Sequence, residues 1–127
     1  MLTINGGSSS IRFAVYEMAA NPRLHVAGKI DRIGGRGARL IVEAPAPKSQ
    51  ALSRGAAAGH VAAVNFLLAW LERQPIFASI TAVGHRVVHG MTHSKPETIT
   101  RRLLAELRRI TPYDPEHLPR EIALIEA

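Results

Sequence analysis

The sequence contains no cysteine, which excludes disulfide bonds, cysteine-based zinc sites and thiol nucleophiles. Its apolar runs are short, and none approaches the roughly 18 residues that a membrane span requires. The N-terminus also lacks the basic and apolar regions of a secretory signal. We therefore expect a soluble, cytoplasmic protein with no membrane partner.

Aromatic residues are scarce as well, with one tryptophan, two tyrosines and three phenylalanines. They are not interleaved with the arginines, so a surface that stacks nucleic-acid bases is poorly supported. Sixteen lysines and arginines against ten acids give a formal charge of +6. Runs such as Arg36–Arg39 are more typical of solvated faces, and we expect no nucleic-acid partner. A phosphorylated small molecule is an equally suitable anionic ligand.

What the chain does have is enough apolar content, 46% of 127 residues, for one domain with a real core. Four short apolar runs separated by turns predict an antiparallel meander, at residues 2–4, 11–16, 24–30 and 38–43. Residues 44–53 contain two prolines and are predicted to form a loop.

The second half of the sequence has a different pattern. Apolar residues at helical spacing predict a helix over residues 55–72, with Val61 on its apolar face. Residues 80–90 have the β-branched content of a strand. Thr100 is a suitable N-cap for a helix over residues 100–110, and Pro119 is a good first-turn residue for a last helix.

The turn Asn5-Gly6-Gly7-Ser8-Ser9-Ser10-Ile11-Arg12 lies between two strand-like runs. Glycines allow an anion to approach the main chain, and backbone N–H groups, hydroxyls and a cation suit a phosphate. The pattern is neither a Walker A loop nor a dinucleotide fingerprint. Considered alone, it is also typical of an ordinary hairpin loop, in which glycine and serine serve turn geometry only.

Three histidines, His85, His89 and His93, are spaced by four residues. On a strand, residues four apart lie roughly 13 Å from each other, which is too far for one metal ion. We therefore do not expect them to bind zinc together. Strand alternation instead places Arg86 and Val88 on one face, where the arginine can present its planar fork to a carboxylate or phosphate. The alternative is a surface arginine in a salt bridge.

Residues 111–119 contain three prolines and form a stiff loop between two predicted helices. A rigidly placed imidazole suits hydrogen bonding to a transition state, so His117 is a candidate catalytic residue. The alternative is that Asp114 and Glu116 only cap the next helix and that His117 is exposed. The remaining histidines, His25 and His60, have the pattern of ordinary strand and helix-face residues.

Three separated segments resemble one family, the acetate kinases. The residues Asn5-Gly6-Gly7-Ser8-Ser9-Ser10-Ile11-Arg12-Phe13 resemble the family's Asn-x-Gly-Ser-Ser-Ser-x-Lys-Phe opening. The residues Gly84-His85-Arg86-Val87-Val88-His89-Gly90 are similar to its Gly-His-Arg-Val-Val-His-Gly segment. His117-x-Pro119 with Ile125-Glu126-Ala127 resembles its His-x-Pro and Ile-Glu-Ala stretch. The order and spacing agree along the whole chain.

The resemblance implies an α/β fold, the actin-like ATPase (ribonuclease H-like) half-fold, with helices packed on a mixed sheet. It implies reversible, Mg²⁺-dependent phosphoryl transfer between ATP and acetate, giving acetyl phosphate and ADP. His117 and Arg86 would be catalytic, Arg86 and Val88 would bind acetate, and Asn5 would also meet the metal. The phosphate-binding residues implied are Asn5, Gly7, Ser8, Ser9, Ser10 and Arg12.

Two positions depart from the family pattern: Arg12 stands where lysine is usual, and Met91 replaces a second glycine. Because family members are far longer, we expect residues 1–127 to form one N-terminal domain without the C-terminal nucleotide-binding domain, and to be incompetent alone. The alternative is a non-catalytic remnant that binds phosphate, acetate or a partner protein. A basic nucleic-acid-binding module is the third reading. The partners considered are a complementary C-terminal domain and a second copy in a homodimer.

Overall fold

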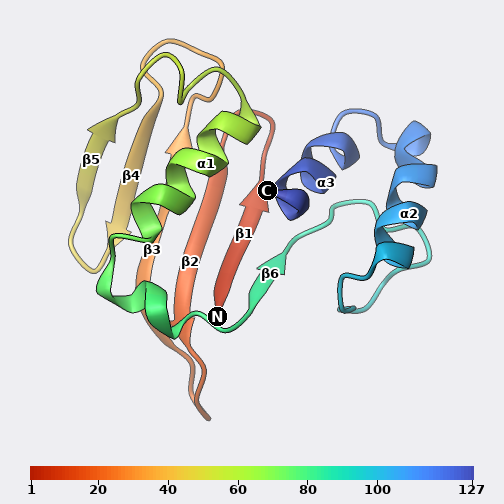
Figure 1. Cartoon of the computed structure of the whole chain (residues 1–127), viewed down its shortest axis with the longest axis horizontal. Helices are drawn as coiled ribbons and strands as arrows, with labels where there is room; N and C mark the ends of the chain where they lie inside the picture. The colour runs from red at the N-terminus through yellow and green to blue at the C-terminus, as the bar shows by residue number, and fades with distance from the viewer.

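In the computed structural model, which describes all residues 1–127, six strands form one sheet in the order β5-β4-β3-β2-β1-β6 (Figure 1). The strands β1 to β5 form an antiparallel meander, and β6 lies parallel to β1 at the other edge. The strands are β1 (Leu2–Gly6), β2 (Ile11–Glu17), β3 (Arg23–Asp31), β4 (Arg39–Ala44), β5 (Lys48–Ala51) and β6 (Val83–His85). The predicted meander is therefore confirmed.

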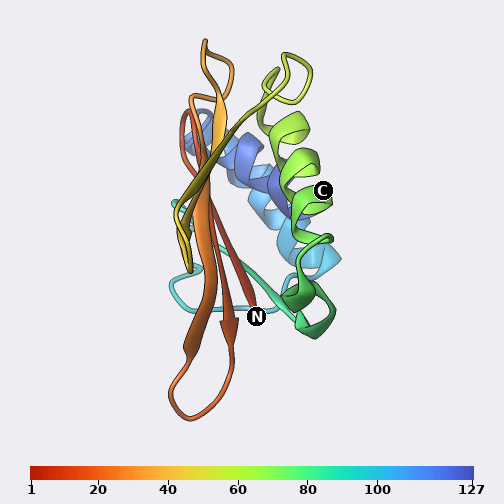
Figure 2. The same ribbon diagram turned by 90° about the vertical axis from the view of Figure 1, so that its left-hand side faces the viewer.

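The helices lie on one side of this sheet, as the edge-on view shows (Figure 2). They are α1 (His60–Leu71), α2 (Arg101–Ile110) and α3 (Leu118–Glu126), with short 3₁₀ turns η1 (Pro75–Ser79) and η2 (Thr111–Tyr113). The Thr100 hydroxyl accepts a hydrogen bond from the Leu103 N–H, 3.1 Å away, which confirms the predicted N-cap. The mixed sheet with helices packed on it is the α/β architecture that the sequence predicted.

The main core lies between α1 and the sheet and contains 15 buried apolar residues, including Leu67 and Phe13. Alternation along the strands supplies one face of this core, because every second residue of β2 is buried. The Phe13 ring packs on Gly28, where an added Cβ would lie 2.3 Å from the Ile41 carbonyl oxygen. Trp70 meets the Phe13 ring edge-on, with centroids 5.8 Å apart, and so packs against the core.

A second apolar cluster joins α2 to α3 beside the β1–β6 edge of the sheet (Figure 1). It contains only four buried residues: Leu107, Ile110, Leu118 and Ile122. Leu103 and Leu104, on the same face of α2 as Leu107 and Ile110, pack against this cluster. None of the helices is long and apolar enough to cross a membrane.

Three local predictions were wrong. The predicted loop at residues 44–53 contains the edge strand β5, whose side chains are all exposed, so no alternation revealed it. The first helix begins at His60 rather than near residue 55, and Val61 on it is 51% exposed rather than buried. The strand predicted over residues 80–90 is confined to Val83–His85. Beyond it, the Val88 N–H and the His89 side chain bond the carboxylates of Glu121 and Asp114 rather than a neighbouring strand.

Candidate functional site

The Gly-rich turn joins β1 to β2 and leaves several hydrogen-bond donors free. Within it, the Gly7 N–H donates to the Ser10 carbonyl at 2.7 Å, and the Ser9 carbonyl accepts from the Ile33 N–H at 2.8 Å. The N–H groups and hydroxyls of residues 8–10 make no hydrogen bond within the protein. Free donors on a glycine-containing turn form the kind of concavity that binds an anion.

Two side chains from distant segments hold this turn, and the sequence pattern predicted neither role. His60, at the start of α1, donates from Nε2 to the Gly7 carbonyl oxygen at 2.8 Å. Arg120, in α3, donates to the Ser8 carbonyl oxygen at 3.3 Å. We expected His60 to be an ordinary helix-face residue, and no local signal links residues 53 positions apart. Both contacts leave the N–H groups of the turn unused.

Asn5 and Arg12 are cross-strand partners next to the turn. Strand alternation places them on the sheet face opposite the buried Ile4 and Phe13, away from the helices (Figure 2). Neither side chain has a hydrogen-bond or ion-pair partner. The Arg86 N–H donates to the Ile4 carbonyl at 3.1 Å, which extends the parallel ladder one step past β6 towards this pair.

Beyond Arg86, the chain is held by a carboxylate of α3. The Val88 N–H donates to both oxygens of Glu121, at 3.1 and 3.2 Å, and the Glu121 residue is only 3% exposed. Burial raises the pKa of Glu121 above its ordinary value, while the hydrogen bond from Val88 and the charge of Arg86 act against that rise. The Glu121 carboxylate thus accepts the Val88 N–H, where a continuing β-strand would have bonded the carbonyl oxygen of a neighbouring strand.

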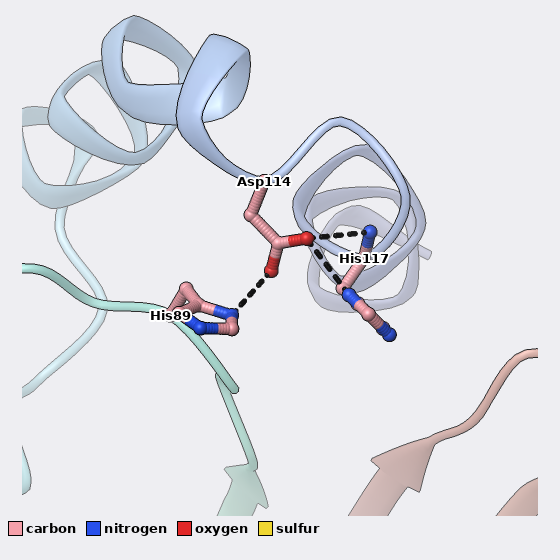
Figure 3. Close-up of side chains that lie close together, drawn as sticks. All are labelled: His89, Asp114 and His117. Carbon is pink, nitrogen blue, oxygen red and sulfur yellow. Dashed lines mark hydrogen bonds and ion pairs between the residues drawn. The ribbon is translucent and has the colours of Figure 1, made fainter.

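Asp114 holds two imidazoles at once (Figure 3). His89 donates from Nδ1 to one carboxylate oxygen at 2.7 Å, and His117 donates from Nδ1 to the other at 2.7 Å. The same oxygen accepts the His117 N–H at 3.3 Å. Burial acts to raise the pKa of Asp114, but the hydrogen bonds from both histidines outweigh it and lower that pKa. The hydrogen bond to Asp114 in turn raises the pKa of His117.

The alternative prediction, that Asp114 and Glu116 only cap the next helix, is partly correct. Asp114 does accept the His117 N–H at the start of α3, as a cap would, whereas Glu116 makes no hydrogen bond. The side chain of His117 is 40% exposed. Because its Nδ1–H is engaged by Asp114, its Nε2 is the atom left for a ligand.

A small pocket brings the Gly-rich turn and His117 together. It is lined by Gly6, Gly7, Glu116, His117, Arg120 and Glu121, so residues more than 100 positions apart in sequence form one surface. The other predicted site residues are not part of its lining: Asn5, Ser8, Ser9, Ser10, Arg12, Arg86 and Val88. Val88 is 37% exposed.

The three histidines spaced by four residues belong to separate surroundings. His85 is on β6, and burial lowers its pKa. His89 is bonded to Asp114, whereas His93 is bonded to Glu97 at 2.7 Å and lies 3.1 Å from Glu106.

An oxygen-preferring cation such as Mg²⁺ finds few ligands on the turn itself. Mg²⁺ in proteins is usually bound through one or two carboxylates, substrate phosphates and water. The turn offers the Asn5 amide and the serine hydroxyls, and the carboxylate that lines the pocket from Glu121 is already engaged by Val88. The turn therefore fits an anion better than a resident metal ion.

Comparisons with known proteins point to one family. The model of the acetokinase family matches residues 1–127. Acetate kinase of Streptomyces coelicolor is 36% identical over 123 residues, which are 94% of this chain and 30% of that protein. Acetate kinase of Rhodopseudomonas palustris (strain TIE-1) is 33% identical over 131 residues, 100% of this chain and 33% of that protein.

Solved structures agree with the sequence relatives. The propionate kinase of Francisella tularensis superposes with a TM-score of 0.85 at 27% identity, covering 98% of this chain and 32% of that one. The acetate kinase of Porphyromonas gingivalis superposes with a TM-score of 0.81 at 28% identity, with the same coverage. The chain spans about a third of the length of the relatives it matches.

Proposed function

The chain belongs to the acetokinase family, and on that premise we propose that it supplies one part of a site for phosphoryl transfer between ATP and acetate. The observation that carries the proposal is the pocket in which the Gly-rich turn meets His117. Phosphoryl transfer needs little covalent chemistry from a protein and is catalysed by positioning and by stabilising charge. The free donors of the turn and the imidazole are suited to both tasks, although the carboxylates of Glu116 and Glu121 also line the pocket.

In this proposal the turn binds the transferring phosphoryl group. The N–H groups and hydroxyls of residues 8–10 have no partner within the protein and are therefore available to phosphate oxygens. His60 and Arg120 hold the turn by its carbonyl oxygens, which keeps those donors in place before a ligand arrives. Gly7 gives the anion close access to the main chain.

His117 donates a hydrogen bond to an equatorial oxygen of the group in transfer. The hydrogen bond from its Nδ1 to Asp114 raises its pKa, which favours the imidazolium and hence a donor at Nε2. An ionised donor forms shorter and stronger hydrogen bonds to an oxyanion than a neutral one does. Asp114 is thus a positioning residue, which orients and charges His117 without touching the substrate.

Arg86 binds the carboxylate of acetate, and Val88 lies against its methyl group. Both residues are fixed through their backbone, because the Arg86 N–H bonds Ile4 and the Val88 N–H bonds Glu121. The Arg86 guanidinium makes no ion pair in the structure and so remains available for bidentate binding of a carboxylate. Arg12, across β1, adds a second positive charge next to Asn5.

Mg²⁺ would reach this site with the nucleotide, since the turn fits an anion better than a bare metal ion. Asn5 is the side chain that we propose as its ligand from these residues, with phosphate oxygens supplying others. The ion would neutralise charge on the phosphates. We also propose that residues 1–127 act as a single domain that needs a nucleotide-binding domain for efficient turnover.

The proposal is tested by titrating the isotope-labelled chain with acetyl phosphate, inorganic phosphate and acetate while recording amide NMR spectra. We expect saturable shifts at Gly7 and residues 8–10 with acetyl phosphate and phosphate, and at Arg86 and Val88 with acetate. His117→Asn should reduce the acetyl phosphate affinity. The matched control His25→Asn should not, because His25 on β3 bonds Glu17 at the end of β2 opposite to the Gly-rich turn. Absence of shifts at the turn would contradict the proposal.

Catalysis is tested by replacing the matching third of the Streptomyces coelicolor acetate kinase with residues 1–127 and measuring acetyl phosphate formation. We expect activity in this chimera and a loss on the order of 10²-fold or more in Arg86→Ala or His117→Ala, as for removal of a transition-state donor. The isolated chain should give none, and efficient turnover by it alone would contradict the single-domain proposal. Ligand binding with an inactive chimera would favour the non-catalytic alternative.

A further inference from the structure

His89, Asp114 and His117 together form a set of metal-binding groups that the phosphoryl-transfer proposal does not use as such. One nitrogen or oxygen atom from each residue lies within 4.8 Å of the corresponding atoms of the other two. Figure 3 shows the carboxylate between the two imidazole rings, with one ring directed at each oxygen. We propose that these three side chains form a binding site for a zinc-class divalent transition metal ion.

The donor chemistry selects the class of metal. Two imidazole nitrogens and one carboxylate oxygen are ligands that suit zinc, cobalt, nickel and iron, whereas Mg²⁺ and Ca²⁺ prefer oxygen ligands alone. Three protein ligands with a remaining position for water are the arrangement of open zinc sites. The side chains of His89 and His117 are 61% and 40% exposed, which leaves the outer side of the set open to an entering ion and its water.

The carboxylate at the centre is held rigidly. The Asp114 side chain is only 8% exposed and accepts three hydrogen bonds, two from the imidazoles and one from the His117 backbone. His117 follows Pro115 and precedes Pro119, so its backbone has few alternative conformations. A metal ion therefore meets groups that are already ordered, and binding costs less conformational entropy than on a flexible loop.

The distances require only a small adjustment. Zinc lies about 2.0–2.2 Å from nitrogen and oxygen ligands, which places neighbouring ligand atoms of a tetrahedron roughly 3.3 Å apart. The two Nδ1 atoms now lie 2.7 Å from opposite oxygens of the carboxylate, and all three ligand atoms lie within 4.8 Å of one another, so both rings would turn to bring their nitrogens to the tetrahedral spacing. Rotation of two half-exposed side chains provides that movement. The ion would displace the two protons that the imidazoles now share with Asp114.

Asp114 supplies the negative charge of the set, and its carboxylate is the group that bonds both imidazoles. The other candidate histidine, His93, faces Glu97 and Glu106 on a separate part of the surface, in an ion-pair network with Arg102. In that network the Arg102 guanidinium already pairs with the Glu106 carboxylate. The two clusters are thus distinguishable by mutation.

The test is a titration of the metal-free chain with Zn²⁺ in competition with a chromophoric chelator, followed by the visible absorption of Co²⁺. We expect one ion per chain and a loss of affinity of tenfold or more in His89→Asn, which removes a ligand whose side chain is 61% exposed. Asp114→Asn should weaken binding at least as much. His25→Asn and His93→Asn are the matched controls and should bind as the unaltered chain does.

Three results would overturn the proposal: no stoichiometric binding, binding that His89→Asn leaves unchanged, or loss of binding in His93→Asn instead. Amide NMR spectra of each variant establish that the fold is retained. The test of the metal site does not depend on the proposed phosphoryl transfer, because it measures metal binding directly.

Discussion

The sheet with α1 and the corner formed by α2 and α3 are stabilised in different ways. The first region has backbone ladders between neighbouring strands and a core of 15 buried apolar residues. The second has four buried apolar residues, and two buried carboxylates, Asp114 and Glu121, connect it to the segment after β6. Figure 1 shows this corner beside β1 and β6.

The pocket lies where these two regions meet. Its lining combines Gly6 and Gly7 from the sheet with residues at the start of α3. Leu124 of α3 joins the main core and reaches Gly6, where an added Cβ would lie 2.6 Å from its side chain. The sheet thus provides a rigid turn, and the corner provides polar groups whose placement depends on few apolar contacts.

The largest effect that would test this comparison is expected in the main core. Leu67→Ala removes a fully buried side chain of α1 and should lower the free energy of unfolding by about 2–5 kcal/mol. Leu107→Ala, in the small cluster, should cost less, because four residues can close a cavity more easily than a packed core can. Val61→Ala, at an exposed position of the same helix as Leu67, is the control. Urea unfolding measures all three, and equal losses for Leu67→Ala and Leu107→Ala would contradict the comparison.

The next effect concerns the carboxylate that anchors the segment after β6. Glu121→Ala leaves the Val88 N–H without its acceptor and should cost about 1–3 kcal/mol, the penalty for leaving a partly buried donor unpaired. The matched variant Glu121→Gln keeps an oxygen acceptor and should cost less. Hydrogen exchange of the Val88 amide measures the effect directly. Unchanged protection of that amide in Glu121→Ala would mean that Glu121 does not hold this segment.

The same residue gives a pH dependence with a definite sign. Burial raises the pKa of Glu121, so between its unfolded and folded pKa values the folded state holds a proton that the unfolded state has lost. The contribution of Glu121 to stability should therefore fall as pH rises through that window and stay constant above it. Unfolding free energies of the unaltered chain minus those of Glu121→Gln, measured across the acidic range, isolate this contribution. A difference that does not vary with pH would contradict it.

A smaller effect is expected at the turn, on the sheet side of the comparison. His60→Ala removes the hydrogen bond to the Gly7 carbonyl and should lower stability by about 0.5–1.5 kcal/mol. Phosphate affinity should also fall, because the donors of residues 8–10 are then less ordered. His25→Ala removes a histidine bonded only to exposed Glu17 and should leave phosphate affinity unchanged. Equal phosphate affinity in the two variants would show that the turn is held without His60.

The sequence predicted the sheet region better than the corner for a physical reason. Alternation in β2 and helical spacing in α1 are local patterns, which follow directly from burial of one face. The motifs also identified the turn, Arg86 and His117 as candidates by resemblance. The edge strand β5 was missed because its four residues are all exposed and carry no alternation.

The contacts of the corner are not local, and no spacing rule encodes them. Asp114 bonds a histidine 25 residues earlier, and Glu121 bonds a backbone N–H 33 residues earlier. A carboxylate beside a proline-rich loop is equally typical of a helix cap, and a cap was the one role that the sequence offered for Asp114, as the alternative to a catalytic His117. His60, 53 residues from Gly7, was overlooked for the same reason.

The smallest effect is expected at Met91, in the corner region. Its φ of 54° lies in the left-handed region that favours glycine, and the family pattern that this segment resembles has a glycine at this position. Met91→Gly should relieve strain of about 1–2 kcal/mol but lose backbone entropy of about 0.5–1 kcal/mol, a net stabilisation of up to about 1.5 kcal/mol. Met18→Gly, at an equally exposed position without a positive φ, should instead destabilise the chain. If thermal unfolding shows both variants destabilised alike, Met91 carries no strain, and the stability of the corner is limited only by its small apolar core.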